Sequence, residues 1–264
     1  EFVLILNNDT EIEQKCLSEL SEAMKEEGVG AAQPKILVSG YSSLIDNTGG
    51  VIDFYGYTKG RGQREIDKGQ FDKDEDIFYA GGTAMVLKKS VLDKVGIFDP
   101  KFIAHWEDVD LSWRIRLAGY RIVFVPKAVI EHKVSRTIQK FGNSIKISFH
   151  IRKNRVAGLI MNYNFFNVLV FLPFVLFFYM LIFLKELFVD WNIPLAFTSI
   201  SALLWNVEEL PYILRKRKFV QNKIRMVADK QIMISMYNKS ILLQDYFMPL
   251  FGSIWKRSIR CLSE

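Results

Sequence analysis

The stretch Glu107-Asp108-Val109-Asp110-Leu111-Ser112-Trp113-Arg114-Ile115-Arg116 decides how this chain is interpreted. It brings three carboxylates, an indole and two guanidinium groups into ten consecutive residues. Leu111 and Ile115 recur at the spacing of one helix face, and Gly119 supplies a stop, so the pattern predicts a helix over 107–118. Its acids would stand at the N-terminus, where the helix dipole favours negative charge. The stretch is therefore either a solvated helix start or an acidic functional site.

Two neighbouring features favour the functional interpretation. After the predicted helix, a strand-like run over 121–125 leads to a lone histidine, His132. A second acidic site, Asn7-Asn8-Asp9, follows the first strand-like run, Phe2–Leu6. Ligands of open α/β sheets bind outside the carboxyl ends of the strands. Acids at two such ends, with a histidine, suit a metal-assisted transferase of phosphorylated substrates.

Alternating strand-like and helical segments predict an α/β fold. Phe2–Leu6 is a continuous apolar run, typical of a strand buried on both faces of a parallel sheet. Thr10 and Glu13 form a capping box, which predicts that a helix begins there, and Gly28 predicts its end. The same signals predict a strand over 83–87, a helix capped by Ser90 and Asp93 and ended by Gly96, and a strand over 122–125 ended by Pro126.

Composition indicates a membrane partner. Hydrophobic residues make up 50% of the 264 residues, and they are concentrated from Phe165 onward. The net charge is +6, and basic clusters at 152–155 and 215–218 stand beside apolar runs. This placement favours a membrane surface over nucleic acid, for which the sequence has no motif. Cys16 and Cys261 give no disulfide framework and no metal-ligand spacing, which favours a reducing compartment.

The apolar region itself has two parts. Residues 165–184 carry no charge and would span about 30 Å as a helix, the thickness of one hydrocarbon core, although a buried helix of a soluble domain has the same signature. The run over 193–207 is shorter and predicts a second span, a re-entrant segment or an interfacial helix. Basic clusters on both sides favour a hairpin or a re-entrant pair, with both flanks in the cytoplasm. The predicted regions are an α/β domain over 1–150, a membrane-associated helical region over 151–214 and a basic amphipathic tail over 215–264.

Several blocks, taken in order, resemble the inverting family 2 glycosyltransferases of GT-A fold, and in particular their rhamnosyltransferase-like branch. The resemblance implies the C-terminal part of a Rossmann-like mixed sheet with flanking helices. The family's first β-α-β units, which hold the nucleotide, have no counterpart here, so we expect an N-terminally truncated fragment that is inactive in isolation. The blocks are Leu6–Thr10, Gly81–Met85, Val95–Asp99, Glu107–Leu111, Trp113–Tyr120 and Val125 to His132.

The resemblance also implies roles for the acids and the histidine. Asp108 corresponds to the catalytic base of the family, and Glu107 would support it or orient the acceptor. Asp9 corresponds to the last acid of the DXD-type motif and would bind a divalent cation, Mn²⁺ or Mg²⁺. His132 corresponds to a further metal ligand, and imidazole suits Mn²⁺ better than Mg²⁺. A turn aspartate and a structural histidine are the alternatives.

The expected substrate-binding residues have structural alternatives as well. Gly81 and Gly82 would let the backbone approach the donor sugar or acceptor, or they are a bare turn before a strand. An arginine of the helix could neutralise leaving phosphate or form an ion pair, as Asp110 and Arg114 would at i and i+4. The residues expected to bind substrate are Gly81, Gly82, Trp106, Trp113, Arg114 and Arg116.

The expected activity is inverting transfer of a sugar from a nucleotide-sugar donor to a glycan or polyprenyl-linked acceptor, in synthesis of a cell-surface polysaccharide. The expected location is a bacterial cytoplasmic membrane, with the catalytic domain on the cytoplasmic face. Two alternatives remain open: a polyprenyl-phosphate glycosyl synthase, whose acceptor is the lipid phosphate itself, and a non-catalytic scaffold tethered to the membrane.

Overall fold

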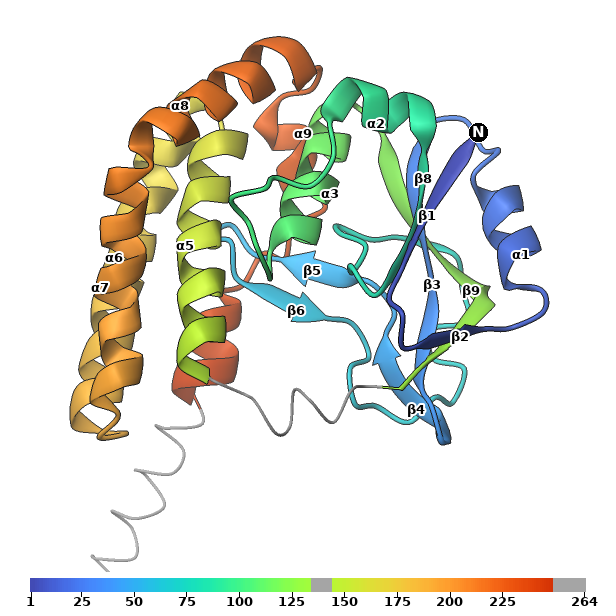
Figure 1. The fold of residues 1–264 in the computed structure, drawn as a ribbon, viewed down its shortest axis with the longest axis horizontal. Coiled ribbons are helices and arrows are strands. Elements are labelled where there is room, and N and C mark those ends of the chain that lie inside the picture. The colour runs from blue at the N-terminus through green and yellow to red at the C-terminus, as the bar shows by residue number, and fades with distance from the viewer. Residues whose placement is uncertain (134–143, 249–264) are drawn as a thin grey trace, which may run out of the picture.

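A computed structural model describes residues 1–133 and 144–248 (Figure 1). The end of the predicted basic tail, with Cys261, lies outside the described residues. A mixed sheet with helices on both faces fills one half of the molecule, and a layer of long helices fills the other. The α/β class with a mixed sheet, expected from the sequence, is therefore confirmed.

The main sheet has seven strands, and its principal path runs β1-β8-β3-β9-β2, with β4 paired to β3 and β7 to β9. Among the described strands, only β3 and β9 run parallel. The remaining pairs are antiparallel, and β5 and β6 form a separate two-stranded sheet. The strands are β1 (Phe2–Leu6), β2 (Thr10–Ile12), β3 (Val29–Val38), β4 (Tyr41–Asn47), β5 (Gly50–Ile52), β6 (Thr58–Gly60), β7 (Glu75–Asp76), β8 (Ala84–Lys88) and β9 (Arg121–His132).

Two strand predictions were wrong in detail. The first strand, β1, pairs antiparallel with β8 and is partly exposed, so it is not a strand buried on both faces of a parallel sheet. Pro126 does not end a strand, because β9 continues to His132. The β3–β9 register shifts between Pro34 and Lys35, at the level of Pro126. This irregularity accommodates a residue that lacks a backbone N–H.

Neither predicted capping box forms. Thr10 lies in β2, and its hydroxyl donates to the carbonyl of Asn7 at 2.6 Å. The first helix, α1 (Cys16–Ala23), begins instead after Lys15, which makes no side-chain cap. Ser90 lies inside α2 (Lys89–Val95), which follows β8 directly. In both places strand pairing with a neighbour, absent from the local sequence signal, sets where the helix starts.

Side-chain alternation along the strands divides the interior into two cores. On β8, Ala84 and Val86 face α1, whereas Met85 and Leu87 face α3 (Glu107–Leu117). The core beneath α1 is small, and the core around α3 continues into the helical layer. Nearly every side chain of α3 is buried, so this helix is an interior element rather than a solvated one. The acids at the start of α3 therefore lie between the sheet and the helical layer.

The helical layer stands beside α3 (Figure 1). Its nearest member, α5 (Ser144–Asn162), lies between the sheet and the antiparallel pair α6 (Phe165–Phe188) and α7 (Ile193–Glu208). Within the described residues, α6 alone is long and apolar enough to cross a membrane, with a mean hydropathy of 2.5. The chain continues through α8 (Leu210–Phe219), the π-helical turn η1 (Val220–Ile224), α9 (Asp229–Met233) and a second such turn, η2 (Leu243–Phe247).

The C-terminal segments return to the core around α3. Ile213 of α8, Val220 and Ile224 of η1 and Ile232 of α9 are all buried there. The predicted tail, up to residue 248, thus packs against the α/β part. The division of the chain at residues 150 and 214 stays a prediction.

Candidate active site

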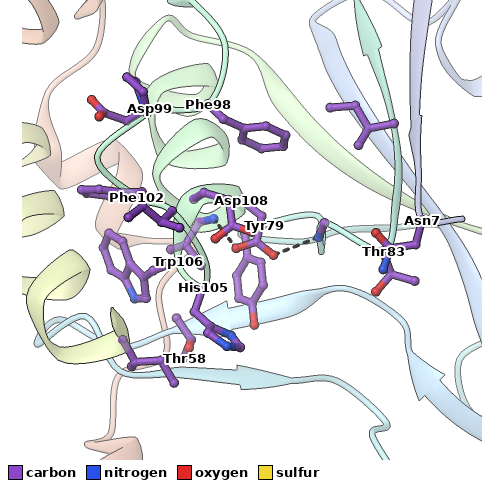
Figure 2. A pocket seen from close by; sticks show the side chains of 17 residues that line it. Asn7, Thr58, Tyr79, Thr83, Phe98, Asp99, Phe102, His105, Trp106 and Asp108 are labelled. Carbon is purple, nitrogen blue, oxygen red and sulfur yellow. Dashed lines mark hydrogen bonds between the residues drawn. The ribbon is translucent and has the colours of Figure 1, made fainter. Parts of the chain in front are cut away.

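A cavity of about 740 Å³ opens where α3 begins (Figure 2). Its floor is the N-terminal turn of α3, and its walls come from the segment before that helix, from the end of β1 and from β6. Glu107, Asp108, Trp106 and Gly82 line it, as the sequence analysis expected of a substrate site. Further lining residues are Asn7, Thr58, Tyr79, Thr83, His105 and Ile151.

An unusual backbone conformation presents the two acids. His105 and Trp106 both have left-handed φ angles, 60° and 74°, directly before α3 begins. Non-glycine residues adopt this region only where their surroundings hold them there. The indole N–H of Trp106 donates to the carbonyl of Gly56 at 3.2 Å. The side-chain amide of Asn154 donates to the carbonyls of Ala104 and His105, at 3.0 and 2.6 Å.

Helix α5 closes tightly on this segment. A Cβ at Gly158 would lie 2.0 Å from Cζ3 of Trp106, a separation that packed atoms do not reach. Glycine is therefore required at this position for the indole to pack under α5. The acids of α3 are thus supported from behind by the part of α5 that the sequence analysis assigned to the membrane-associated region.

The two acids differ in their contacts. Asp108 accepts a hydrogen bond from the backbone N–H of Gly82 at Oδ2, 2.9 Å, and one from the N–H of Val109 at Oδ1, 2.8 Å. Glu107 has a buried oxygen, Oε2, with no partner in the described part of the chain. Burial raises the pKa of Asp108, against these hydrogen bonds. Burial and the neighbouring Asp108 raise the pKa of Glu107 to about 7.

The glycine pair is held by side chains of the sheet. The N–H of Gly81 donates to Oε1 of Gln33 at 2.6 Å, and the amide of Gln33 donates to Asn47 at 2.9 Å. Gly82 lines the cavity and Gly81 lies behind it. The glycine pair therefore positions the N–H of Gly82 against Asp108, a structural role that the sequence analysis did not predict.

Three expected substrate-binding residues lie in the interior instead of the cavity. Trp113 is fully buried, and its ring packs edge-on against Tyr163 with 4.8 Å between ring centroids. Arg114 donates to the carbonyls of Val95 and Ile97 and to Asp110, so the expected i, i+4 ion pair forms, but it is buried. Arg116 donates to the carbonyls of Phe78 and Ile77. None of the three lines this cavity, although Arg114 lines a separate one of about 420 Å³. The two arginines hold backbone segments that adjoin the first cavity.

Asp9 and His132 lie together where β2 pairs with β9. The pairing of Thr10 with His132 in the β2–β9 ladder brings Asp9 Oδ1 to 3.2 Å from His132 Nε2. On its other side, Nδ1 of His132 lies 2.9 Å from Oδ2 of Asp46. These two acids raise the pKa of His132. Neither Asp9 nor His132 lines the cavity, but Asn7, two residues before Asp9, does.

The pair fits a divalent cation in part. Adjacent ligands of an octahedral ion, each about 2.1 Å from the metal, stand about 3 Å apart, close to the observed separation. The Asp46 carboxylate behind the imidazole is the arrangement that orients metal-bound histidines. No group of three or more His, Cys, Asp or Glu among the described residues is placed to hold a metal ion. Asp9 and His132 would therefore need ligand oxygens from a bound diphosphate or water.

Sequence reasoning missed the supporting residues. Asn154 and Gly158 lie on α5, about 50 residues after the loop they support, and Asp46 lies 86 residues before His132. Nothing in the local sequence marks Asn154 or Asp46. The one signal was the position of Gly158 inside an apolar helical segment, since a glycine there costs stability unless close packing requires it.

Comparison with known proteins identifies the family of this chain. Residues 2–214 match the family described as Glycosyl transferase family group 2. That match covers most of the chain, and the chain belongs to this family.

One curated relative is N-acetylglucosaminyl-diphospho-decaprenol L-rhamnosyltransferase of Mycobacterium tuberculosis, 34% identical over 65 residues. The aligned part covers 24% of this chain and 21% of that relative, so the chain matches about a fifth of its length. This likeness concerns a short segment and transfers no residue role.

Two solved structures are similar at low identity. GalNAc-T7 with UDP, GalNAc and Mn²⁺ is 14% identical, with a TM-score of 0.47, over 84% of this chain and 41% of that one. The mannosyltransferase PcManGT from Pyrobaculum calidifontis, in complex with GDP-Man and Mn²⁺, is 15% identical, with a TM-score of 0.39, over 89% and 60%. At these scores, neither structure bears on the roles of individual residues.

Proposed function

We propose that this protein transfers a sugar from a nucleotide-sugar donor to a lipid-linked or glycan acceptor, by inverting single displacement at a membrane surface. The observation that carries the proposal is the paired carboxylates, Glu107 and Asp108, at the floor of a cavity large enough for a sugar acceptor. Membership of the glycosyl transferase family supports the reaction class. The name of the mycobacterial relative supports a polyprenyl diphosphate-linked acceptor.

In this mechanism Asp108 is the general base. Its carboxylate takes the proton of the acceptor hydroxyl as that oxygen attacks the anomeric carbon and the nucleoside diphosphate leaves. The N–H of Gly82 holds Oδ2 of Asp108 in place, so the carboxylate is oriented before substrate arrives. Glu107, with its pKa near neutral, positions or shares the proton beside it.

Asp9 and His132 are proposed to hold a divalent cation, Mn²⁺ or Mg²⁺, with Asp46 orienting the imidazole. Such an ion would offset charge on the leaving diphosphate. Gly82 and Trp106 are proposed to contact substrate, whereas Gly81, Trp113, Arg114 and Arg116 act through the wall of the cavity.

The membrane part of the proposal is carried by the outward face of α6 and α7. Exposed side chains of α6 include Phe166, Phe174 and Phe177, and Trp191 in the connecting turn is 80% exposed. A patch of this kind marks a membrane or protein interaction site. We propose that it contacts the cytoplasmic membrane, with the cavity on the cytoplasmic side.

The test is nucleotide release by the full-length protein in membranes, with UDP-, GDP- and dTDP-sugars, with and without Mn²⁺. We expect metal-dependent release of one nucleoside diphosphate, and transfer to a polyprenyl diphosphate-linked sugar. Release that requires plain polyprenyl phosphate as acceptor would identify a polyprenyl-phosphate glycosyl synthase instead. No release from any donor, with folded protein, would contradict the enzymatic proposal and favour a scaffold.

A further inference from the structure

A second cavity adjoins the first beneath α5. It has a volume of about 300 Å³ and shares two lining residues, Thr58 and Ile151, with the larger cavity. It lies between α5, α6 and the C-terminal segment that ends in η2, which runs beside α5 in Figure 1. We call it the α5 cavity, and its walls include Tyr57, Arg152, Arg155, Ile182, Ile241 and Leu242.

One wall of the α5 cavity carries two buried arginines with different surroundings. Arg152 is neutralised, since it lies 2.6 Å from Glu186 and also donates to Thr198 and Ser199. Arg155 is only 6% exposed, and its Nε donates to the carbonyl of Gly56 at 3.1 Å. In the described part of the chain, no carboxylate lies within ion-pair distance of Arg155.

The groups around Arg155 leave it able to bind an anion. Its guanidinium stacks 3.6 Å from the ring of Tyr57, whose buried hydroxyl has no partner in the described residues. The nearby carboxylate of Asp53 already accepts three backbone N–H groups, from Tyr55, Tyr57 and Ile241. Asp245, which also lines the cavity, pairs with Lys59 at 2.8 Å. Among the described residues, Arg155 thus has no carboxylate partner and the Tyr57 hydroxyl has no hydrogen-bond partner, and both side chains line the α5 cavity.

The opposite wall of the α5 cavity is apolar. Ile182, Ile241 and Leu242 are each at most 5% exposed and face the arginine wall. Ile182 belongs to α6, whose other face carries the exposed apolar side chains. A ligand with an anionic head and an apolar chain matches both walls, because a charged head alone would leave the apolar wall unused.

We propose that the α5 cavity binds the phosphate nearest the lipid chain of an isoprenoid phosphate or diphosphate, with Arg155 and the Tyr57 hydroxyl as its donors. The inference rests on the proposed function, which it deepens. The cavity adjoins the acids through Thr58 and Ile151, so a lipid held there would place its linked sugar toward Asp108. The chemistry recognised is a phosphate ester on an apolar chain.

The test is direct binding to the full-length purified protein, with farnesyl diphosphate, farnesol and inorganic pyrophosphate as separate probes in calorimetry. We expect farnesyl diphosphate to bind and both other probes to bind at least about tenfold more weakly, since each lacks one half of the ligand. Farnesol binding equally well would overturn the anion site. Pyrophosphate binding equally well would overturn the role of the apolar wall and leave a free-phosphate site.

Variants connect binding to the named residues. Arg155→Gln should weaken farnesyl diphosphate binding by about 10-fold or more, and Arg155→Lys should retain part of it. Tyr57→Phe should weaken it about fivefold, and this variant keeps the test open if Arg155→Gln does not fold. Arg121→Gln, on an exposed arginine that lines neither cavity, is the matched control. Unchanged affinity in both Arg155→Gln and Tyr57→Phe would overturn the proposal.

The design separates this inference from the proposed function. Nucleotide release is measured on wild-type protein without the lipid probe. If no donor is cleaved but farnesyl diphosphate binds in an Arg155-dependent way, the lipid phosphate site stands and the transferase proposal fails. If transfer occurs and the variants bind farnesyl diphosphate normally, the transferase proposal stands and the lipid phosphate site fails.

Discussion

Gly158→Ala tests whether α5 sets the position of the catalytic acids. The added methyl would lie 2.0, 2.8 and 2.9 Å from Cζ3, Cη2 and Cε3 of Trp106, so the indole must move by more than 1 Å to restore ordinary contact at about 3.5 Å or more. Overpacking of this kind costs about 1–3 kcal/mol. In a domain of this size that lowers the melting temperature by roughly 2–12 °C.

The same displacement should reach the chemistry. Trp106 is the residue before Glu107, and a misplacement of about 1 Å can cost about 100-fold in rate. We therefore expect Gly158→Ala to lower kcat for sugar transfer by about that factor, in protein that remains folded. Circular dichroism melting and a nucleotide-release assay on the full-length protein measure the two effects.

Two further variants make the test specific. Gly60→Ala is the matched control, because a Cβ there meets nothing closer than 3.5 Å, and it should change neither quantity. Combining Gly158→Ala with Trp106→Leu should cost less stability than the two single changes added together, since the smaller side chain relieves the clash. Wild-type melting and wild-type kcat in Gly158→Ala would refute the reasoning.

Four other predictions concern single sites. Asp108→Asn should lower transfer by about 10²- to 10⁴-fold without lowering the melting temperature, and normal turnover would remove Asp108 as the base. Folding raises the pKa of Glu107 from 4.5 to about 7, so between these pH values the folded state binds a proton that the unfolded state has lost. The free energy of unfolding should therefore fall as pH rises from 4.5 to about 7, and Glu107→Gln should abolish that part of the pH profile in denaturant titrations. Arg114→Met leaves the Asp110 carboxylate buried without its cation and should destabilise by about 3–5 kcal/mol in urea unfolding, whereas a change below about 1 kcal/mol would mean that the pair is solvated. Asp46→Ala should weaken Mn²⁺ binding by about 10- to 100-fold in electron paramagnetic resonance titrations, and unchanged binding would place the cation away from His132.

The local sequence predicted elements whose signals are carried by a few adjacent residues. Hydrophobic periodicity located α3, and long apolar runs located α6 and α7. Gly96 and Gly119 marked helix ends with left-handed φ angles of 81° and 90°. The i, i+4 spacing of Asp110 and Arg114 predicted their ion pair. These features depend on contacts within one or two helical turns, and a sequence pattern can represent such contacts.

Features decided by distant contacts were not predictable from the pattern. The capping boxes at Thr10 and Ser90 failed because β2 pairs with β9 and β8 continues directly into α2. The burial of Trp113 and Arg116 depends on α3 being enclosed by the sheet on one side and by α5 on the other. A charged helix with a tryptophan looks like a surface element when its neighbours are unknown. Glu107, Asp108, Asp9 and His132 were easier to identify as candidate site residues, because few structural roles suit acidic and histidine side chains.

The support that α5 gives to the loop before α3 limits how this protein can be shortened. A soluble version cut at residue 150, within α5, would lose Asn154, Gly158 and Asn162 together with α6 and α7. The left-handed residues His105 and Trp106 would then lack the amide donor and the packing surface that hold them, and Asp110 would lose a hydrogen bond at Oδ1. A water-soluble variant should instead keep residues 144–248 and replace the exposed side chains of α6 and α7 with polar ones.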